Sequence, residues 1–473
     1  MDQSKDRVLP KRGDTLYGFI TSERIWYLLL IFFSLISGIF LLISPMPEVV
    51  LGIVSLILIC LLLFFHPFLG ILAYIILSYT RVVEDYIPPL ANLHFTRILT
   101  IVLIIIWLIR TALITKKIFL WEKEFNVLYV LLLVAGISIP FSFWPTYSFE
   151  HSVDFLKTFV FVFMLVHLVD DLKKFKVFIW VFLLVHIFLA ITPVRMFIAL
   201  GPEAVQMRLG TATRGFLGDA HDFALAVTLV LPFSFYLFIN EKNKSPRFLL
   251  FVSMIVLFWG IVSTSSRGGF VTLVVIISYL LFKSQKKLVG IILILFILAT
   301  ILILAPKEFW ERQSTIISYQ EDPSALGRIV AWKAGLTMFL DRPLTGVGMD
   351  CFSIAYGARY HLPQVKEWIA AHNAYIQIGA ELGVLGLTCY LLLIYLIYKE
   401  NNRLQKSIKR GPLGNNFYIT ISQALKASLI AYAVGSLFLS AAYYPHLYIL
   451  IGLTLINKLL VKKELGPVFS NKG

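Results

Sequence analysis

The feature that most constrains this chain is a series of apolar stretches separated by short polar breaks. An α-helix needs about 20 apolar residues to cross the hydrocarbon core of a bilayer. Hydrophobic residues make up 59% of the 473 residues, and charged residues make up 15%, against about 25% charged in soluble domains. A chain of this length and composition cannot bury its apolar residues in one aqueous core. The pattern therefore excludes a soluble enzyme and predicts an all-α polytopic membrane protein.

Fourteen stretches fit this pattern, so we expect about 12–14 transmembrane helices. The third stretch is short, and the turns around Pro45-Met46-Pro47 and His66-Pro67 are also compatible with a re-entrant pair. The stretches lie at 26–43, 49–65, 68–80, 97–114, 126–143, 151–169, 176–192, 222–240, 248–265, 268–282, 288–305, 377–398, 418–440 and 443–461.

The net charge of +15 is explained mainly by membrane topology. With the N-terminus in the cytoplasm, 26 of the 42 Lys and Arg residues fall on the cytoplasmic side and 13 on the outer side. Cytoplasmic loops of membrane proteins carry an excess of Lys and Arg. The positive charge therefore sets the orientation in the lipid bilayer, and no nucleic acid is expected as a partner.

This map divides the chain into five parts. The longest segment without a span, 306–376, faces outward, and its content of Trp, Phe, Ile and Leu predicts a folded loop. An amphipathic helix in this loop is expected to end at Asp341-Arg342-Pro343. The parts are a cytoplasmic tail (1–25), eleven spans with an outer loop at 193–221 (26–305), the large outer loop (306–376), three further spans (377–461) and a second cytoplasmic tail (462–473).

Two arginines on the outer side lie in distinctive surroundings. Arg267 follows a run of Ser and Thr and precedes two glycines, which favours an anion site, although a snorkelling arginine at a helical hairpin is the simpler interpretation. Arg328 and Trp332 are four residues apart and share one helix face. Taken alone, that pattern is better explained by an interfacial helix whose arginine meets lipid headgroups.

Two further motifs carry ionisable groups at the start of spans. His372 faces water beside the membrane, where a neutral histidine can act as a general base, and Asn373 could orient it or bind a sugar hydroxyl. The alternative is an interfacial histidine without a role. Arg214 lies in a Gly- and Thr-rich segment that ends at Asp222. A capped helix start explains Asp219 and Asp222 there, but it explains Arg214 and His221 less well.

The four motifs together are more specific than any one of them, because Arg214, Arg267, Arg328 and His372 all fall on the outer side. Guanidinium groups bind phosphate oxygens in pairs of hydrogen bonds and neutralise a departing diphosphate, while a neutral histidine can activate a hydroxyl nucleophile. No acidic cluster has clear spacing for a divalent metal, so we expect neither a metal site nor a cofactor.

These motifs resemble those of the O-antigen ligase and polymerase superfamily of bacterial envelope glycosyltransferases. The resemblance covers roughly residues 200–400, and two further segments look like the exosortase-associated O-glycosylation ligase subgroup. The superfamily motifs are Ser265-Ser266-Arg267-Gly268, Gly327-Arg328 with Trp332, Gly346-Val347-Gly348 and His372-Asn373; the subgroup segments are His66-Pro67-Phe68-Leu69-Gly70 and Gly218–Ala224.

The resemblance implies a GT-C-like helical fold and a glycan donor carried on undecaprenyl diphosphate at the outer face of the inner membrane. It implies that Arg267 and Arg328 contact the diphosphate and that His372 activates the acceptor hydroxyl, in an inverting single displacement without a metal. We add Arg214, Ser266, Asn373 and Trp332 as predicted substrate contacts.

The leading interpretation is a ligase that transfers the glycan to a glycolipid, a glycan or a protein. A polymerase that uses a second lipid-linked repeat as its acceptor would share the same chemistry. From another class, a transporter or flippase could use Lys157, Lys426 and Glu381 as a coupling path, although the chain lacks the matched, broken helices typical of transporters. An inactive scaffold of an envelope-assembly complex is a further alternative.

Overall fold

Helices account for every regular element in the residues that the computed structural model describes. Hydrocarbon cannot pair with backbone N–H and C=O groups, so an apolar chain in a bilayer pairs them within helices. The predicted all-α polytopic membrane fold is therefore confirmed. The described residues are 57–81, 95–112, 122–210, 217–283, 287–316, 323–361, 368–410 and 416–465.

Eight of the described helices are long and apolar enough to cross a bilayer, and a bent pair, Ile57–Phe65 with α4, can add a ninth. The predicted stretches near 97–114, 268–282 and 288–305 fall on α6, α13 and α14, whereas 26–43 and most of 49–65 lie outside the described residues. The eight are α7 (Lys123–Ser138) with the 3₁₀ turn η3 (Ile139–Phe141), α8 (Pro145–Leu168), α9 (Leu172–Leu200), α11 (Ala220–Asn240), α12 (Lys244–Ser263), α18 (Ala374–Arg410), α19 (Asn416–Gly435) and α20 (Pro445–Leu465).

The chain divides into two units, and the first comprises Met1–Ile71 and Arg97–Phe119. Its described part contains the helix Ile57–Phe65, the start of α4 (Pro67–Thr80) and most of α6 (Phe95–Arg110). The first two helices meet at His66-Pro67 with a bend of 115°. Arg110 donates hydrogen bonds to the carbonyls of Phe64 and Phe65, which stand at the end of the first helix.

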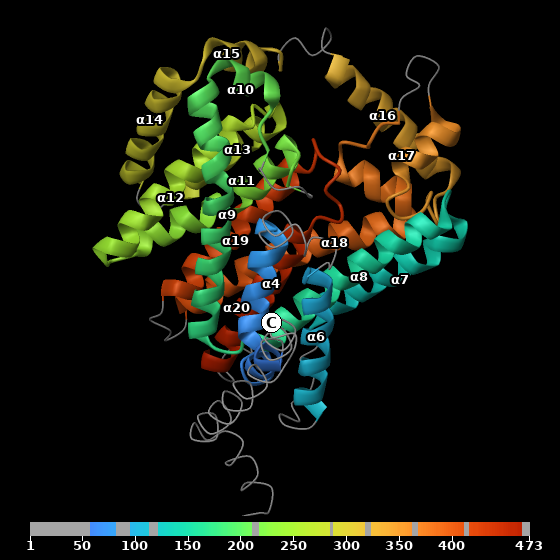
Figure 1. Cartoon of the computed structure of the whole chain (residues 1–473), viewed down its shortest axis with the longest axis horizontal. Coiled ribbons are helices and arrows are strands. Elements are labelled where there is room, and N and C mark those ends of the chain that lie inside the picture. The colour runs from blue at the N-terminus through green and yellow to red at the C-terminus, as the bar shows by residue number, and fades with distance from the viewer. Residues whose placement is uncertain are drawn as a thin grey trace, which may run out of the picture. The chain divides into compact units, whose positions relative to one another are not determined.

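The second unit, Leu72–Thr96 with Leu120–Gly473, contains all the motifs that the sequence singles out in the second half of the chain. Its most enclosed spans are α11 and α20, each with 83% of its apolar window buried. The first packs against α12 and α19, and the second packs against α8, α18 and α19. In Figure 1 these helices run side by side through the bundle.

Small residues bring α11 and α19 together. Ser428 donates a hydrogen bond across the interface to the carbonyl of Leu229, at 2.6 Å. A Cβ atom on Gly435 would lie 2.6 Å from a methyl group of Leu225. Close backbone approach and interhelical hydrogen bonds are the main sources of helix association where hydrocarbon surrounds both partners.

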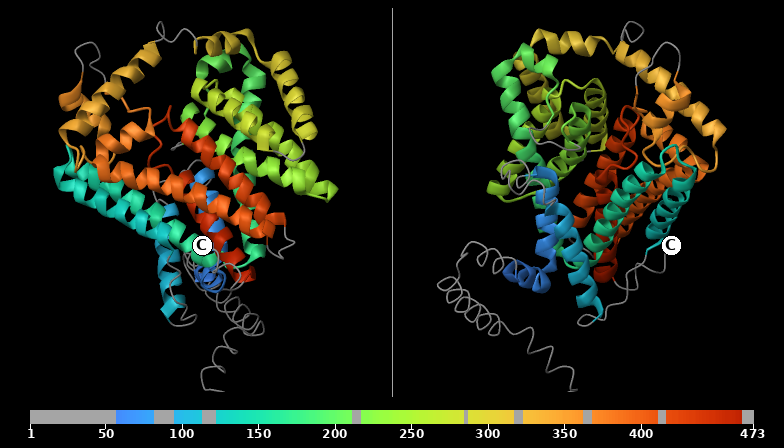
Figure 2. Two further views of the ribbon diagram at one scale, coloured as in Figure 1. Left: turned by 180° about the vertical axis from the view of Figure 1, so that it is seen from behind. Right: turned by 45° about the vertical axis from the view of Figure 1, so that its right-hand side comes forward.

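Short helices gather at the end of the second unit where α18 begins. In this unit α15 packs against α10 and α16 packs against α18, and Figure 2 shows the long α18, in orange, beside the teal α7. These elements are α10 (Pro202–Met207), α13 (Arg267–Lys283), α14 (Lys287–Leu304), α15 (Lys307–Ser314), α16 (Pro323–Asp341), α17 (Phe352–Ala355) and the π-helical turn η5 (Tyr356–Tyr360).

The Gly346-Val347-Gly348 motif fits against a break in α18. The backbone of α18 leaves the helical region at Gly383, and the carbonyl of Glu381 accepts a hydrogen bond from the N–H of Gly348 at 3.0 Å. A Cβ on Gly346 would lie 2.2 Å from the Glu381 oxygen, and one on Gly348 would lie 2.1 Å from Ser142. Both glycines also have positive φ, so side chains are excluded there by contact and by conformation.

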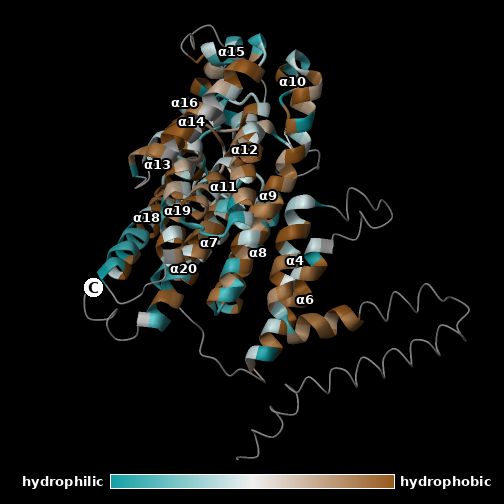
Figure 3. Ribbon diagram, turned by 90° about the vertical axis from the view of Figure 1, so that its left-hand side faces the viewer, coloured by the Kyte–Doolittle hydropathy of each residue, from teal (hydrophilic) through white to brown (hydrophobic). Residues whose placement is uncertain are grey.

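Opposite charges are buried together at the other end of the same helices. Lys458 is 3% exposed and contacts Glu122 at 2.9 Å, Glu124 at 3.1 Å and Glu400 at 3.9 Å. Lys462 adds a contact of 2.8 Å to Glu122. This lysine cluster joins α20 to the starts of α7 and the second half of α18. Figure 3 shows hydrophilic residues along the last turns of α18 as well.

We expect Lys458→Met to destabilise the protein by about 3–5 kcal/mol, because removing one partner of a buried ion pair leaves the other charges uncompensated. Thermal unfolding of the purified protein in detergent measures this effect. Lys463→Met is the matched control, since Lys463 is exposed and makes a single long hydrogen bond of 3.4 Å to the Asp170 carbonyl. Equal unfolding temperatures for the two variants would show that the lysine cluster does not hold the helices together.

Candidate functional site

The turn between α12 and α13 is built by hydroxyl side chains. Thr264 donates from its hydroxyl to the carbonyl of Ile261 at 2.7 Å, and the same oxygen accepts the N–H of Ser266 at 3.1 Å. Ser265 has a φ of +50°, which reverses the chain and starts α13 at Arg267. The sequence folds in this way because Ser and Thr hydroxyls pair with backbone groups that the helix end leaves open.

Arg267 and its neighbour Arg312 link this turn to α15. Arg267 donates from Nη1 to the hydroxyl of Thr315 at 2.9 Å, and Arg312 donates from Nε to the carbonyl of Ser265 at 2.9 Å. Both arginines are partly buried. The predicted diphosphate contact Arg267 therefore lies against α15, together with a second guanidinium.

A chain of polar contacts leads from α10 to the same turn. Nη2 of Arg208 contacts Nε2 of His221, and Nδ1 of His221 lies 2.6 Å from the hydroxyl of Ser266. The N–H of Gly269 donates to the Ser266 hydroxyl at 3.1 Å. The predicted substrate contact Ser266 is 2% exposed and stands in the middle of this network.

Two glycines and an acid hold the start of α11 in place. Asp219 caps α11 by accepting the N–H of His221 at 2.7 Å. A Cβ on Gly210 would lie 2.0 Å from the carbonyl oxygen of Gly218, so the two backbones touch. Arg214, which the sequence analysis proposed as an additional contact, falls in 211–216 and lies outside the described residues.

Helix α16 is tied to the segment before α18 through Trp332. The indole N–H of Trp332 donates to the carbonyl of Ala371 at 3.1 Å, one residue before His372. Arg328 lies one turn earlier on the same helix and is partly buried. The indole N–H is thus used within the protein, and the ring surface is what Trp332 can offer a substrate.

His372 occupies a strained turn that leads into α18. Its φ is +46°, and its N–H donates to the hydroxyl of Ser440 at 2.8 Å. Asn373 caps α18, since its side-chain oxygen accepts the N–H groups of Tyr375 and Ile376 at 2.9 and 3.1 Å. This fixes the backbone on both sides of the imidazole.

The electrostatic surroundings of His372 show which groups converge. Burial lowers its pKa below the ordinary value of 6.5; Arg328 and Arg208 lower it further, and Asp219 acts in the opposite direction. These residues come from four separate elements, namely α16, the end of α10, the start of α11 and the turn before α18. The fold therefore places Arg328 and Arg208 within electrostatic range of the His372 imidazole, and the contact of Trp332 with Ala371 ties α16 to the residue before His372.

A second polar cluster surrounds Asp350. Its carboxylate contacts Nδ1 of His151 at 3.1 Å and accepts the hydroxyl of Tyr147 at 3.2 Å, and burial raises its pKa against the effect of these two partners. Glu381 is 1% exposed and accepts the N–H of Phe352 at 3.2 Å. No group of three or more His, Cys, Asp and Glu side chains within the described ranges is suited to hold a metal ion.

The three side chains of a transporter-like coupling path have separate local partners. Lys157 pairs with Asp154, Lys426 donates to the amide oxygen of Asn402, and Glu381 binds the backbone before α17. Their contacts do not link them to one another.

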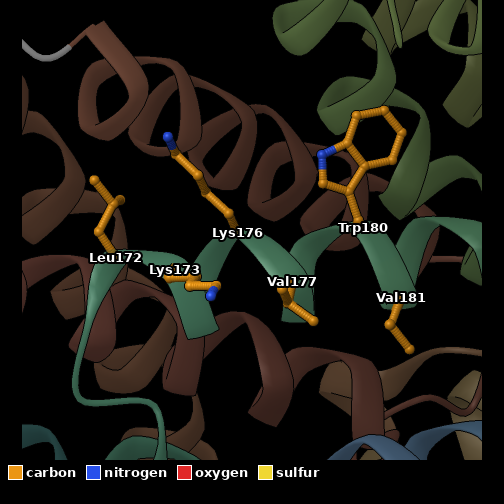
Figure 4. A pocket seen from close by; sticks show the side chains of 6 residues that line it. All are labelled: Leu172, Lys173, Lys176, Val177, Trp180 and Val181. Atoms are coloured by element: carbon orange, nitrogen blue, oxygen red, sulfur yellow. The ribbon is translucent and has the colours of Figure 1, made fainter.

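An apolar groove of about 540 Å³ lies elsewhere, along the first turns of α9. Figure 4 shows its lining, in which two lysines are the only ionisable groups. None of the residues in the Ser266 and His372 networks lines it, so the groove is not the candidate site. The lining residues are Leu172, Lys173, Lys176, Val177, Trp180 and Val181.

Sequence reasoning did not single out Arg208; it named Asp219 as a candidate helix cap, which the structure bears out, and left His221 without an assigned role. Arg208 is one of the outer arginines by the positive-inside count, and the two others belong to the Gly- and Thr-rich motif before α11. The count of outer arginines and the Gly- and Thr-rich motif were the sequence signals for these residues. Neither signal indicated that His221 contacts Ser266.

Residues 251–391 match the family model described as O-antigen ligase. The chain is also similar to an uncharacterized protein of Haemophilus influenzae, with 26% identity over 216 residues that cover 41% of this chain. The match spans 50% of that relative's own length.

The family match contains the turn with Ser266 and Arg267, helix α16 with Arg328, and His372 with most of the apolar part of α18. The resemblance inferred from the motifs is confirmed at the level of the superfamily, while the subgroup stays a prediction. In this multi-pass membrane protein, the match of residues 251–391 to the O-antigen ligase family supports a relation to the O-antigen ligase superfamily.

Proposed function

We propose that this protein is a glycosyltransferase that moves a glycan from undecaprenyl diphosphate to an acceptor hydroxyl. The acceptor belongs to a glycolipid, a glycan or a protein. The reaction takes place at the outer face of the bacterial inner membrane, inverts the anomeric carbon and requires no metal ion.

The observation that carries this proposal is the proximity of Arg328 to His372. Burial, and then the Arg328 guanidinium, lower the pKa of the imidazole below its ordinary value, so His372 is neutral at pH 7 and can accept a proton. The same guanidinium is suited to bind a phosphate oxygen. A base and an anion-binding group side by side are what transfer from a diphosphate to a hydroxyl requires.

In the proposed reaction, His372 takes the proton of the acceptor hydroxyl as its oxygen forms a bond to the anomeric carbon. The bond between that carbon and the diphosphate oxygen breaks, and the electron pair leaves with the diphosphate. Arg328 and Arg267 neutralise the negative charge that develops on the leaving group. A single displacement from the opposite side inverts the configuration.

The orientation of the site follows from the distribution of charge. Among the described residues, the basic start of α9 and the basic end of α18 lie near the lysine cluster, because Lys463 contacts Asp170 and Lys458 contacts Glu400, and α18 begins at the other end. This supports a site that faces the exterior. The polyprenyl chain of the donor would remain in the bilayer beside the helices.

We expect His372→Asn to lower glycan transfer by a factor of about 10²–10⁴, the usual contribution of a general base. Arg328→Lys and Arg267→Lys should each lose most of the activity, because an ammonium group cannot form the paired hydrogen bonds of a guanidinium.

The assay uses purified protein, a glycan on undecaprenyl diphosphate and an acceptor, with His167→Asn as the control histidine on α8. Full activity of His372→Asn, or loss of wild-type activity with EDTA, would contradict the mechanism.

The pH dependence of transfer tests the environment of His372. Because the base must be neutral, activity should fall as the pH drops through a pKa that lies below 6.5. Asp219 raises this pKa, so Asp219→Asn should move the fall in activity to lower pH, and asparagine can still cap α11. Asp154→Asn, on the exposed side of α8, is the control. A shift to higher pH in Asp219→Asn would be inconsistent with His372 as the base.

A polymerase that uses a second lipid-linked repeat would share these residues. Gel analysis of envelope glycans from a deletion strain separates the two activities. For a ligase we expect whole chains to be missing from the acceptor. Loss of the chain-length ladder with single repeats still attached would instead identify a polymerase.

A further inference from the structure

The contact between Arg208 and His221 determines the protonation of this histidine. A guanidinium can donate hydrogen bonds but cannot accept them, so Nε2 of His221 must be the acceptor. A histidine that accepts at Nε2 carries its proton at Nδ1. That proton is donated to the hydroxyl oxygen of Ser266, which lies 2.6 Å away.

With this assignment, the hydroxyl proton of Ser266 is not used by His221 and can be donated to another acceptor. Its oxygen already accepts two hydrogen bonds, from Nδ1 of His221 and from the N–H of Gly269 at 3.1 Å. A hydroxyl oxygen has two lone pairs, and both are occupied. The O–H bond of Ser266 is thus directed away from both neighbours as a donor.

Two more polar groups, one on Arg208 of this network and one on the residue before Ser266, are buried without partners within the described residues. They are Nε of Arg208 and the hydroxyl of Ser265, whose residue is completely buried. Buried donors without acceptors are costly, and they are rare in folded proteins unless a ligand or water satisfies them. The nearby carboxylate of Asp219 is engaged in capping α11.

We propose that Arg208, Ser265 and Ser266 form an anion-binding subsite for a phosphate group, with His221 as the positioning residue that joins Arg208 to Ser266. A phosphate offers several acceptor oxygens to these three donors, and the guanidinium of Arg208 supplies the opposite charge. The proposal rests on the proposed function for one point, that the phosphate belongs to a lipid diphosphate.

The two histidines of the site then have different tasks. The Nε2 lone pair of His221 is occupied by Arg208, so His221 cannot take a proton from an acceptor hydroxyl. For the His372 imidazole, burial, Arg328 and Arg208 all lower the pKa. His221 orients donors for the leaving group, and His372 acts on the nucleophile.

The test measures binding of farnesyl diphosphate to the purified full-length protein, with farnesol and inorganic phosphate as separate probes. Ser266→Ala and Arg208→Gln should each weaken binding by about tenfold or more, as expected for a lost hydrogen bond to a charged group. Ser263→Ala is the matched control, because Ser263 is buried and donates within α12 to the carbonyl of Gly260. It should bind as the wild type does.

Variants at His221 separate positioning from general support of the fold. Asparagine can place an N–H near the position of Nδ1, and glutamine can place an acceptor near Nε2, so each should weaken binding less than His221→Leu does. In the transfer assay, His221→Asn should raise KM for the lipid-linked donor. The pH at which activity falls should still be set by the pKa of His372. A change confined to kcat would contradict a role in diphosphate binding.

The outcomes distinguish this inference from the proposed function. Wild-type binding of farnesyl diphosphate that depends on Ser266, without any glycan transfer, would support the subsite and reject the transferase. Glycan transfer with a Ser266→Ala variant that binds farnesyl diphosphate as tightly as Ser263→Ala would reject the subsite and keep the transferase. Equal binding of farnesol would also reject it, because the phosphate would then contribute nothing.

Discussion

The structure depends on one constraint, that backbone polar groups in an apolar bilayer must be paired within the protein. Regular helices pair these groups along their length, but the N–H groups of the first turn and the C=O groups of the last turn have no partner within the helix. The polar motifs of this chain accordingly stand where helices stop. The non-glycine residues with left-handed backbone in the described second unit include Arg208, Ser265, Asp350 and His372, and each lies at a helix junction.

Buried charge is treated differently at the two ends of the second unit. In the lysine cluster, Lys458 and Lys462 contact Glu122, Glu124 and Glu400, so opposite charges within the protein join the helices. At the other end, the groups that act on His372 are two arginines and one carboxylate. That end carries an excess of positive charge among the groups that act on His372, which is the basis of the proposed anion binding.

Strain and function coincide around His372. The left-handed turns at Ser265 and His372 cost conformational energy, and hydrogen bonds from Arg312 and to Ser440 hold them in place. Helix α15 thus supports the turn before α13, and the turn before α20 supports the start of α18. The short helices at this end of the bundle position the candidate site rather than bury apolar surface.

Much of the fold could be predicted from local pattern. The apolar stretches predicted membrane helices, and the four-residue spacing placed Arg328 and Trp332 on one face of α16, because helical periodicity is a local property. The motif Gly346-Val347-Gly348 was recognised only as a resemblance. Its physical reason, contact with Glu381 and Ser142, depends on where α18 breaks.

By itself the sequence determined the class of fold and the distribution of positive charge, and it singled out Arg267, Arg328 and His372 as predicted site residues. The tertiary structure decided which side chains meet: Arg208 contacts His221, and His221 contacts Ser266. These contacts join turns that are distant in the chain. Each turn takes its conformation from the helices packed around it, and no local pattern records that packing.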